Sequence, residues 1–231
     1  SGKTTLALAV MRLIQSEGGI TYRGQNVRNW STRELRRLRS EMQIVFQDPY
    51  ASLNPRMTVG EIVGEGPMVH GLSDKEEREA KVRELLAKVG LNQSHVHRYP
   101  HEFSGGQRQR IGIARALCVR PDLIVADEPV SALDVSIQAQ IINLLKDLQD
   151  QLGLSYLFIS HDLNLVAKFC DRVLIMYAGC IVDACRSSEL RDSQHPYTQG
   201  LFASLPKLDE PQKRLAVLQR CETWLEDKEG V

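Results

Sequence analysis

The sequence predicts an α/β protein with a parallel sheet and an inserted helical segment. A continuous apolar run at residues 123–126 is typical of a strand buried on both faces of a parallel sheet, and residues 154–159 predict a second buried strand. Between them lies a long amphipathic helix pattern that ends at Gly153, and the order strand, helix, strand implies a right-handed crossover. Residues 48–71 are instead rich in Pro, Gly and Asn, and the helical patterns that follow them contain no good strand.

The segments before this insertion alternate between helix and strand. Apolar residues at helical spacing predict a helix over residues 3–16, and short strands are expected on both sides of a turn at residues 23–25. Ser31 and Glu34 have the spacing of a capping box, which predicts the start of a basic helix. A short apolar strand is expected at residues 42–46.

The helical and C-terminal segments carry their own boundary signals. Ser73 and Glu76 have the spacing of a second capping box, and the helix that they begin ends at a glycine. Another helix begins at Ser104. After the parallel strands, residues 172–182 predict a hairpin around a glycine, and the tail from residue 194 is expected to be helical and increasingly polar.

Composition and charge exclude several classes of protein. The chain has 231 residues, of which 42% are hydrophobic and 25% charged, as in a soluble globular protein rather than a disordered or collagen-like chain. Its 29 basic and 29 acidic residues cancel, so no summed field attracts nucleic acid or an anionic membrane. Five cysteines without CxxC pairing indicate a reducing compartment. No apolar stretch approaches the roughly 18 residues needed to cross a bilayer.

The N-terminus carries half of a phosphate-binding motif. Gly2, Lys3, Thr4 and Thr5 stand at the start of an amphipathic helix and match the second half of the loop GxxxxGK[ST]. Amide N–H groups and the helix dipole at such a start hold phosphate oxygens. Lys3 would reach the β and γ phosphates, and the Thr4 hydroxyl would bind Mg²⁺. By itself the pattern also fits an ordinary helix start with a threonine near its cap.

A pair of carboxylates follows the first buried strand. Asp127 and Glu128 come directly after the apolar run, so they would lie at the carboxyl edge of the sheet, where α/β proteins bind ligands. Asp127 would hold Mg²⁺, directly or through water, and Glu128 would be the general base that orients the attacking water. The alternative, that the pair only caps the turn before Pro129, is weakened by the phosphate-binding motif.

A second glycine-containing helix start is the most informative stretch. Ser104, Gly105, Gly106 and Gln107 offer N–H groups, a hydroxyl and an amide that can hold an anion. A serine cap alone would not explain the paired glycines, which weaken a helix start. Residues 107–110 (Gln-Arg-Gln-Arg) could be a basic patch for nucleic acid, but the zero net charge favours a solvent-exposed helix face.

Together these motifs resemble those of the ATP-binding cassette ATPases, the nucleotide-binding subunits of ABC transporters. Six motifs occur in family order: the end of Walker A at residues 1–5, the Q-loop Gln47, the signature FSGGQ at 103–107, Walker B LIVADEP at 123–129, the D-loop SALD at 131–134 and the switch histidine His161. The resemblance implies a RecA-like P-loop core with an inserted α-helical subdomain. The expected division is a core of residues 1–47 and 118–193, a helical signature subdomain of residues 48–117 and a C-terminal helical extension of residues 194–231.

The resemblance also implies that two chains share each nucleotide. Two cassettes dimerise head to tail, and each ATP is closed between Walker A of one chain and the signature motif of the other. Lys3, Thr4 and Thr5 would bind phosphates and Mg²⁺, while Gln47 would sense the metal and the attacking water. His161, which alone would fit a buried, hydrogen-bonded histidine at a strand end, would contact the γ-phosphate.

The signature motif would complete the partner's site. Ser104, Gly105 and Gly106 would hold the γ-phosphate bound by the partner chain. Gln107 and the D-loop residue Asp134 are also expected to bind the nucleotide.

A longer stretch narrows the family. Residues 46–56 (FQDPYASLNPR) are similar to the oligopeptide, dipeptide and nickel importer ATPases, in particular to their F-type subunit. The resemblance implies ATP hydrolysis that drives peptide import at the cytoplasmic face of the plasma membrane, with nickel or glutathione as alternative solutes. The implied partners are a second ATPase subunit, as a homo- or heterodimer, two integral membrane permease subunits and, indirectly, an extracytoplasmic solute-binding protein. Nucleic acid is not expected as a partner.

Departures from the family pattern leave other hypotheses open. The family's first strands and its adenine-stacking aromatic residue lie upstream of Walker A, so the chain is expected to be a fragment that starts within that motif. A helical tail over residues 211–227, in which Cys221 stands alone, is expected to be a frayed end. The alternatives are a non-transport cassette that acts on nucleic acid or ribosomes, and an inactive truncated cassette that only binds partners.

Overall fold

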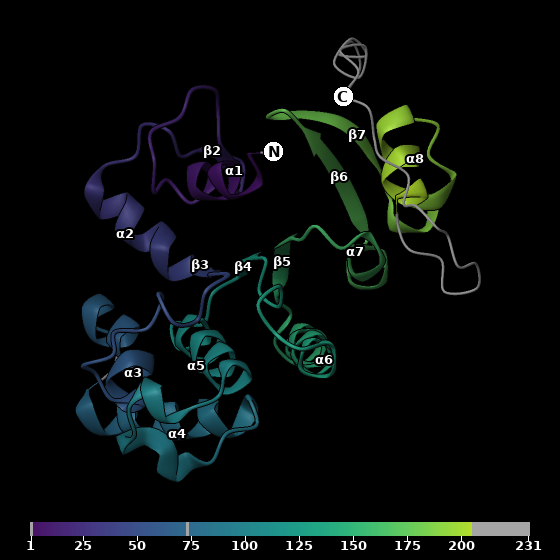
Figure 1. Ribbon diagram of the computed structural model, residues 1–231. Coiled ribbons are helices and arrows are strands. Elements are labelled where there is room, and N and C mark those ends of the chain that lie inside the picture. The colour runs from purple at the N-terminus through teal and green to yellow at the C-terminus, as the bar shows by residue number, and fades with distance from the viewer. Residues whose placement is uncertain (1, 73, 205–231) are drawn as a thin grey trace. The chain divides into compact units, whose positions relative to one another are not determined.

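The computed structural model describes residues 2–72 and 74–204. They form two compact units, one made of residues 6–160 and the other of residues 2–5 and 161–204. Helices and strands are labelled as in Figure 1. Among the described residues, no helix is both long and apolar enough to cross a membrane.

A parallel sheet organises the first unit. Its strands lie in the order β3-β4-β5, with bounds β3 (Met42–Val45), β4 (Leu123–Asp127) and β5 (Ser155–Ile159). Helix α6 (Val135–Leu152) connects β4 to β5, and Gly153 ends it in the left-handed conformation, as predicted. β4 is buried from Ile124 to Asp127, whereas the middle of β5 is only half-buried. The expectation of a strand buried on both faces is therefore met by β4 and not by β5.

The segments before β3 cover part of this sheet. They are α1 (Lys3–Val10), the hairpin strands β1 (Thr21–Tyr22) and β2 (Gln25–Asn26), and α2 (Thr32–Glu41). α1 is shorter than the predicted helix over residues 3–16, because Arg12 has a φ of 54° that no right-handed helix can accommodate. The capping box of Ser31 and Glu34 is present as predicted. The apolar side chains of this region pack in one core: Ala7, Met11, Val27, Leu38, Met42, Val125 and Ile159.

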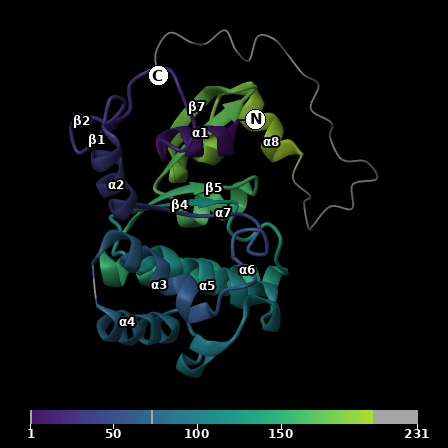
Figure 2. The ribbon, with the colours of Figure 1, turned by 90° about the vertical axis from the view of Figure 1, so that its left-hand side faces the viewer.

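A group of helices fills the chain between β3 and β4. Its members are α3 (Val59–His70), α4 (Lys75–Lys88), the 3₁₀ turns η1 (Gln93–His97) and η2 (Pro100–Glu102), and α5 (Gly105–Leu117). Figures 1 and 2 show α3, α4 and α5 packed together, with α5 on the side nearest the sheet. The cap of α4 is Asp74, one residue later than the predicted Ser73, and its side chain accepts a hydrogen bond from the Glu77 amide.

The second unit is built on an antiparallel hairpin. Its elements are α7 (Leu163–Phe169), β6 (Arg172–Tyr177), β7 (Cys180–Arg186), η3 (Ser187–Asp192) and α8 (Pro196–Ala203). Ala178 and Gly179 both have positive φ, which is the geometry of a tight hairpin turn. The Asp183 carboxylate accepts hydrogen bonds from the hydroxyls of Ser193 and Thr198, each 2.6 Å long, and so joins β7 to α8. The predicted tail helix at residues 211–227 lies outside the described residues.

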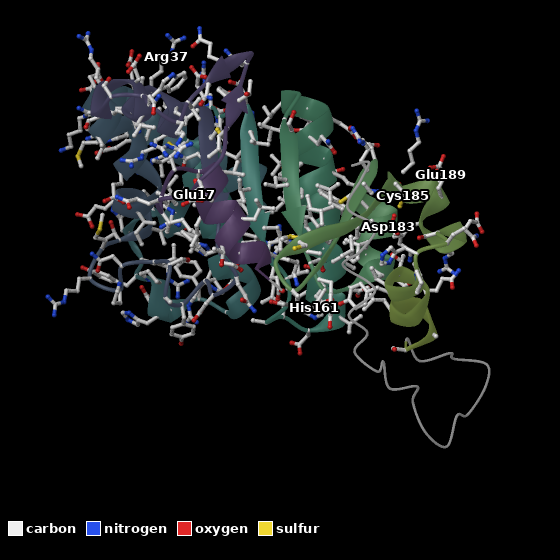
Figure 3. The ribbon with its side chains drawn as sticks, turned by 90° about the horizontal axis from the view of Figure 1, so that it is seen from above. Glu17, Arg37, His161, Asp183, Cys185 and Glu189 are labelled. Atoms are coloured by element: carbon white, nitrogen blue, oxygen red, sulfur yellow. The ribbon has the colours of Figure 1, made fainter. Side chains whose placement is uncertain are left out.

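The described cysteines of the second unit form no disulfide, and Cys185 has two carboxylates as neighbours. Cys185 lies next to Asp183 and Glu189 (Figure 3). Burial first, and then the charges of these two carboxylates, raise the pKa of the Cys185 thiol. Within the described residues, no group of three or more His, Cys, Asp or Glu side chains could hold a metal ion.

Candidate nucleotide site

The carboxyl edge of the parallel sheet carries the acidic pair. Asp127 is the last residue of β4, lies opposite Ile159 of β5 and is 3% exposed. Glu128 is the next residue and is half-buried. Because ligands of open parallel sheets bind at this edge, the pair stands where the sequence predicts a nucleotide site.

The backbone of Glu128 has an unusual conformation that the sequence does not signal. Its φ is 46°, in the left-handed region that costs a residue with a Cβ about 1–2 kcal/mol. The Glu128 amide donates to the carbonyl of Ile159 at 2.9 Å. Its carbonyl accepts hydrogen bonds from both the amide (3.2 Å) and the hydroxyl (3.1 Å) of Ser131. Strained residues of this kind persist only where neighbours hold them, and they are common at functional sites.

Gln47 lies beside this carboxylate. It follows β3, the strand adjacent to β4, and its Nε2 donates a hydrogen bond to Oε2 of Glu128 at 3.3 Å. The structure thus brings together two residues, 81 positions apart, that the sequence had assigned to one site. Next to a carboxylate that can accept a proton, a side-chain amide can orient a small polar molecule such as water.

The serine–glycine motif forms the start of α5. Ser104 is its cap: the Ser104 hydroxyl accepts from the Gln107 amide at 3.3 Å, and the Gln107 side chain accepts from the Ser104 amide at 3.0 Å. The two glycines also have a packing role. A Cβ on Gly105 would lie 3.2 Å from Leu133, and one on Gly106 would lie 2.6 Å from Ile137. A serine cap does not by itself require these two glycines. Close packing does, because without side chains they allow α5 to approach the D-loop and the start of α6.

The arginines and glutamines after this motif do not form an exposed face. Arg108 is 6% exposed and Gln109 is 2% exposed, so the prediction of a solvent-exposed helix face at residues 107–110 is wrong. The Arg108 guanidinium donates to the carbonyls of Pro100 (2.7 Å) and His101 (3.4 Å), which is how its charge is tolerated away from water.

The D-loop presents a carboxylate at the start of α6. Asp134 occupies the cap position, but its side chain makes no capping bond to the helix, although Asp commonly does so. The residue is exposed. The Asp134 carboxylate is therefore not used to cap its own helix.

The phosphate-binding residues begin α1. Gly2 has a φ of 87°, and Lys3, Thr4 and Thr5 form the first turn of the helix. Gly2 is packed so closely that a Cβ would lie 3.5 Å from the Cα of Gly179 in the β6–β7 turn. A positive-φ glycine before a helix start turns successive amides toward one point, which is the arrangement that binds phosphate.

His161 opens the second unit. It follows the end of β5 by two positions and is exposed (Figure 3). The next residue, Asp162, caps α7: its carboxylate accepts hydrogen bonds from the amides of Asn164 and Leu165. The reading of His161 as a buried histidine is therefore wrong. The sequence marked Ser131 only as the first residue of the D-loop and gave no sign that it holds the Glu128 backbone.

A three-stranded parallel sheet with paired carboxylates at its edge, together with a Gly-Lys-Thr helix start, defines the class of P-loop nucleotide hydrolases. Residues 1–131 match the ABC transporter family. The chain belongs to that family. The predicted α/β fold, a RecA-like core of the ABC ATPase type with an inserted helical segment, is also confirmed.

Individual proteins similar to this chain are also ATP-binding proteins. A Brucella ovis protein named for peptide import and ATP binding is 56% identical over 211 residues, which are 90% of this chain and 67% of that protein. The oligopeptide transport ATP-binding protein OppF of Bacillus subtilis is 51% identical over 223 residues, covering 95% of this chain and 73% of OppF. The ATP-binding cassette MJ0796, solved as a dimer bound to ADP and Pi, is 29% identical with a TM-score of 0.71, over 80% of this chain and 81% of MJ0796.

Proposed function

We propose that this chain is the ATP-binding and ATP-hydrolysing subunit of an ABC importer of peptides. The observation that carries the proposal is the Glu128 carboxylate at the edge of β4, held by its backbone and in contact with the amide of Gln47. The names of the relatives, which refer to peptide import and oligopeptide transport, support peptides as the solute.

Glu128 is the general base in this proposal. Its carboxylate accepts a proton from the water that attacks the γ-phosphate, and Gln47 orients that water through its side-chain amide. The fixed backbone of Glu128 limits the positions that its side chain can sample, which favours a single orientation for proton transfer. His161 is proposed to contact the γ-phosphate.

Mg²⁺ fits the oxygen donors that the chain offers. The hydroxyl of Thr4, the buried carboxylate of Asp127 and the amide oxygen of Gln47 are hard ligands of the kind that this ion prefers. When bound, the ion would neutralise part of the charge on the phosphates. Gly2, Lys3, Thr4 and Thr5 would hold the phosphates themselves through backbone amides and the ammonium of Lys3.

A second cassette subunit would complete the site. Ser104, Gly105, Gly106 and Gln107 form a helix start whose amides can face the γ-phosphate bound by the partner. Asp134, whose carboxylate does not cap its own helix, is proposed to act at the same junction. The corresponding division is a nucleotide-binding core of residues 1–47 and 118–193, a signature subdomain of residues 48–117 and an extension of residues 194–231.

The remaining partners follow from the importer hypothesis. Two membrane permease subunits would dock on the helical segment around residues 49–71, and a solute-binding protein outside the membrane would act through them. The subunit would then lie at the cytoplasmic face of the plasma membrane. Uptake of labelled di- and oligopeptides, measured beside Ni²⁺ and glutathione in cells with and without the gene, tests the solute. Unchanged uptake of every peptide in the deletion strain would refute peptide import.

The hydrolytic role is tested with Glu128→Gln in the assembled complex. We expect turnover to fall at least about a hundredfold, the usual contribution of a general base, while Mg-ATP still binds. Glu79→Gln, an exposed change on α4, is the matched control and should keep normal turnover. Normal turnover in Glu128→Gln would show that this carboxylate is not the base.

A further inference from the structure

The segment that follows Gln47 is bound to α5 by two arginines. Asp48 folds this segment into a compact turn, because its carboxylate accepts the Tyr50 amide at 2.7 Å and its carbonyl accepts the Ser52 amide at 3.2 Å. The Arg108 guanidinium carbon lies 3.6 Å from the centre of the Tyr50 ring. Arg115 donates from Nη1 to the carbonyl of Ser52 at 2.6 Å.

These two arginines share one face of α5. They are seven residues apart, which is close to two helical turns, so both point toward the same neighbouring segment. Arg108 is 6% exposed and Arg115 is half-buried. Their guanidiniums contact backbone carbonyls and the face of a tyrosine ring. Hydrogen bonds and cation–π contacts from a charged guanidinium are strong where little water competes, so these arginines restrict the movement of their partners.

The same contacts reach the signature motif. Arg108 lies one turn after Ser104, and it also holds the carbonyls of Pro100 and His101 in η2, just before the motif. Tyr50 is three residues beyond Gln47, whose side chain contacts Glu128. A short, folded connection therefore joins the start of α5 to the amide beside the proposed base.

We propose that Tyr50, Arg108 and Arg115 are positioning residues that link the signature helix α5 to Gln47, so that the placement of α5 sets the contact between Gln47 and Glu128. The inference rests on the proposed ATPase function. A displacement of α5, for example when its start meets a nucleotide held by a partner, would displace the turn that contains Tyr50. Gln47 would move with that turn, and the orientation of the attacking water would change with it.

Tyr50 is the residue to change, because its side chain can be altered without opening the core. The residue is 67% exposed, whereas Arg108 is buried and Arg115 half-buried, and their loss could unfold the unit. Tyr50→Phe keeps the ring face over Arg108, and Tyr50→Leu removes it while keeping an apolar side chain. Tyr99→Leu is the control, because Tyr99 is also an exposed tyrosine of the helical segment, at 41%, but its ring stacks on His101 rather than on an arginine.

The first measurement is steady-state ATP hydrolysis in the assembled complex. For Tyr50→Leu we expect kcat to fall roughly three- to thirtyfold, the range that one partly buried cation–π contact allows, with KM for Mg-ATP within about twofold. Tyr50→Phe and Tyr99→Leu should stay within about twofold of the wild type. Equal losses in Tyr50→Leu and Tyr99→Leu, equal losses in both Tyr50 variants, or a wild-type kcat in Tyr50→Leu would each overturn the proposal.

The second measurement does not depend on catalysis. Amide hydrogen exchange of residues 48–53 in the purified full-length protein should rise several-fold in Tyr50→Leu and stay near the wild-type value in Tyr50→Phe. If the wild type hydrolyses no ATP, the proposed function fails, while the exchange rates still decide whether the ring holds the turn. Unchanged exchange in Tyr50→Leu would show that the link is not there.

Discussion

Replacing glycine by alanine should have different effects on stability at two positions of the same helix. Gly106 and Gly112 both lie in α5 and neither has a positive φ. A Cβ on Gly106 would lie 2.6 Å from Cγ2 of Ile137, whereas a Cβ on Gly112 would have no atom outside its own helix backbone and chain neighbours within 4 Å. The pair therefore separates intrinsic helix propensity from packing between α5 and α6.

The two substitutions should change stability in different directions. Alanine in place of glycine favours a helix interior by about 1 kcal/mol, so Gly112→Ala should stabilise the protein by up to that amount. In Gly106→Ala the same gain is opposed by overpacking, which costs about 1–3 kcal/mol. Cγ2 of Ile137 is attached to Cβ and moves only if χ1 leaves its preferred rotamer or the helices separate. The net result is a loss of about 0–2 kcal/mol.

Thermal and urea unfolding of both variants measure this difference. About 1–3 kcal/mol should separate Gly106→Ala from Gly112→Ala, and each kcal/mol corresponds to about 2–4 °C in Tm at this chain length. Adding Ile137→Ala should remove most of the penalty of Gly106→Ala, because the atom that it meets is gone. If Gly106→Ala is as stable as Gly112→Ala, close packing is not what requires glycine there.

Three further changes test local structure. Ser31→Ala should lower stability in urea at pH 7 by about 1 kcal/mol through loss of the α2 cap. Hydrogen bonds from Ser31 lower the pKa of Glu34, so this stabilisation is present above the carboxyl's ordinary pKa and is lost as pH falls through its folded value. The difference between variant and wild type should therefore shrink at pH 3, and a constant difference would contradict the assignment. Asp183→Asn should speed amide exchange in α8, because the charged acceptor of Thr198 is lost; unchanged exchange would mean that the carboxylate does not join β7 to α8. Burial raises the pKa of Cys118 to about 11, so iodoacetamide at pH 8 should label Cys118 only after unfolding, as mass mapping would show.

The order of secondary structure could be read from the chain because local rules set it. The Ser31 capping box, the buried strand at 123–126 and the glycine at 153 each act over a few residues, and each is found where it was expected. The ABC transporter family was likewise identified correctly from motif order, which is a property of the sequence alone.

The motif residues could be named from the sequence but not given their geometry. Glu128 was predicted as an acidic residue at a strand end, yet its left-handed backbone is held by a hydrogen bond that its amide donates to Ile159 and by hydrogen bonds that its carbonyl accepts from Ser131. The contact between Gln47 and Glu128 depends on β3 and β4 being neighbours in the sheet. Neither property is contained in the local sequence, because both arise from residues brought together by the sheet.

The sequence by itself thus determined the fold class, the family and the residue types of the nucleotide site, since helix caps, apolar periodicity and motif spacing act within short stretches of chain. Only the tertiary structure decided that Arg108 is buried rather than solvent-exposed, because the carbonyls of η2 and the ring of Tyr50 surround its charge. It also decided that Gly106 must be small, because Ile137 of α6 packs against it. Burial and close contact are set by partners distant in sequence, and no local pattern specifies those partners.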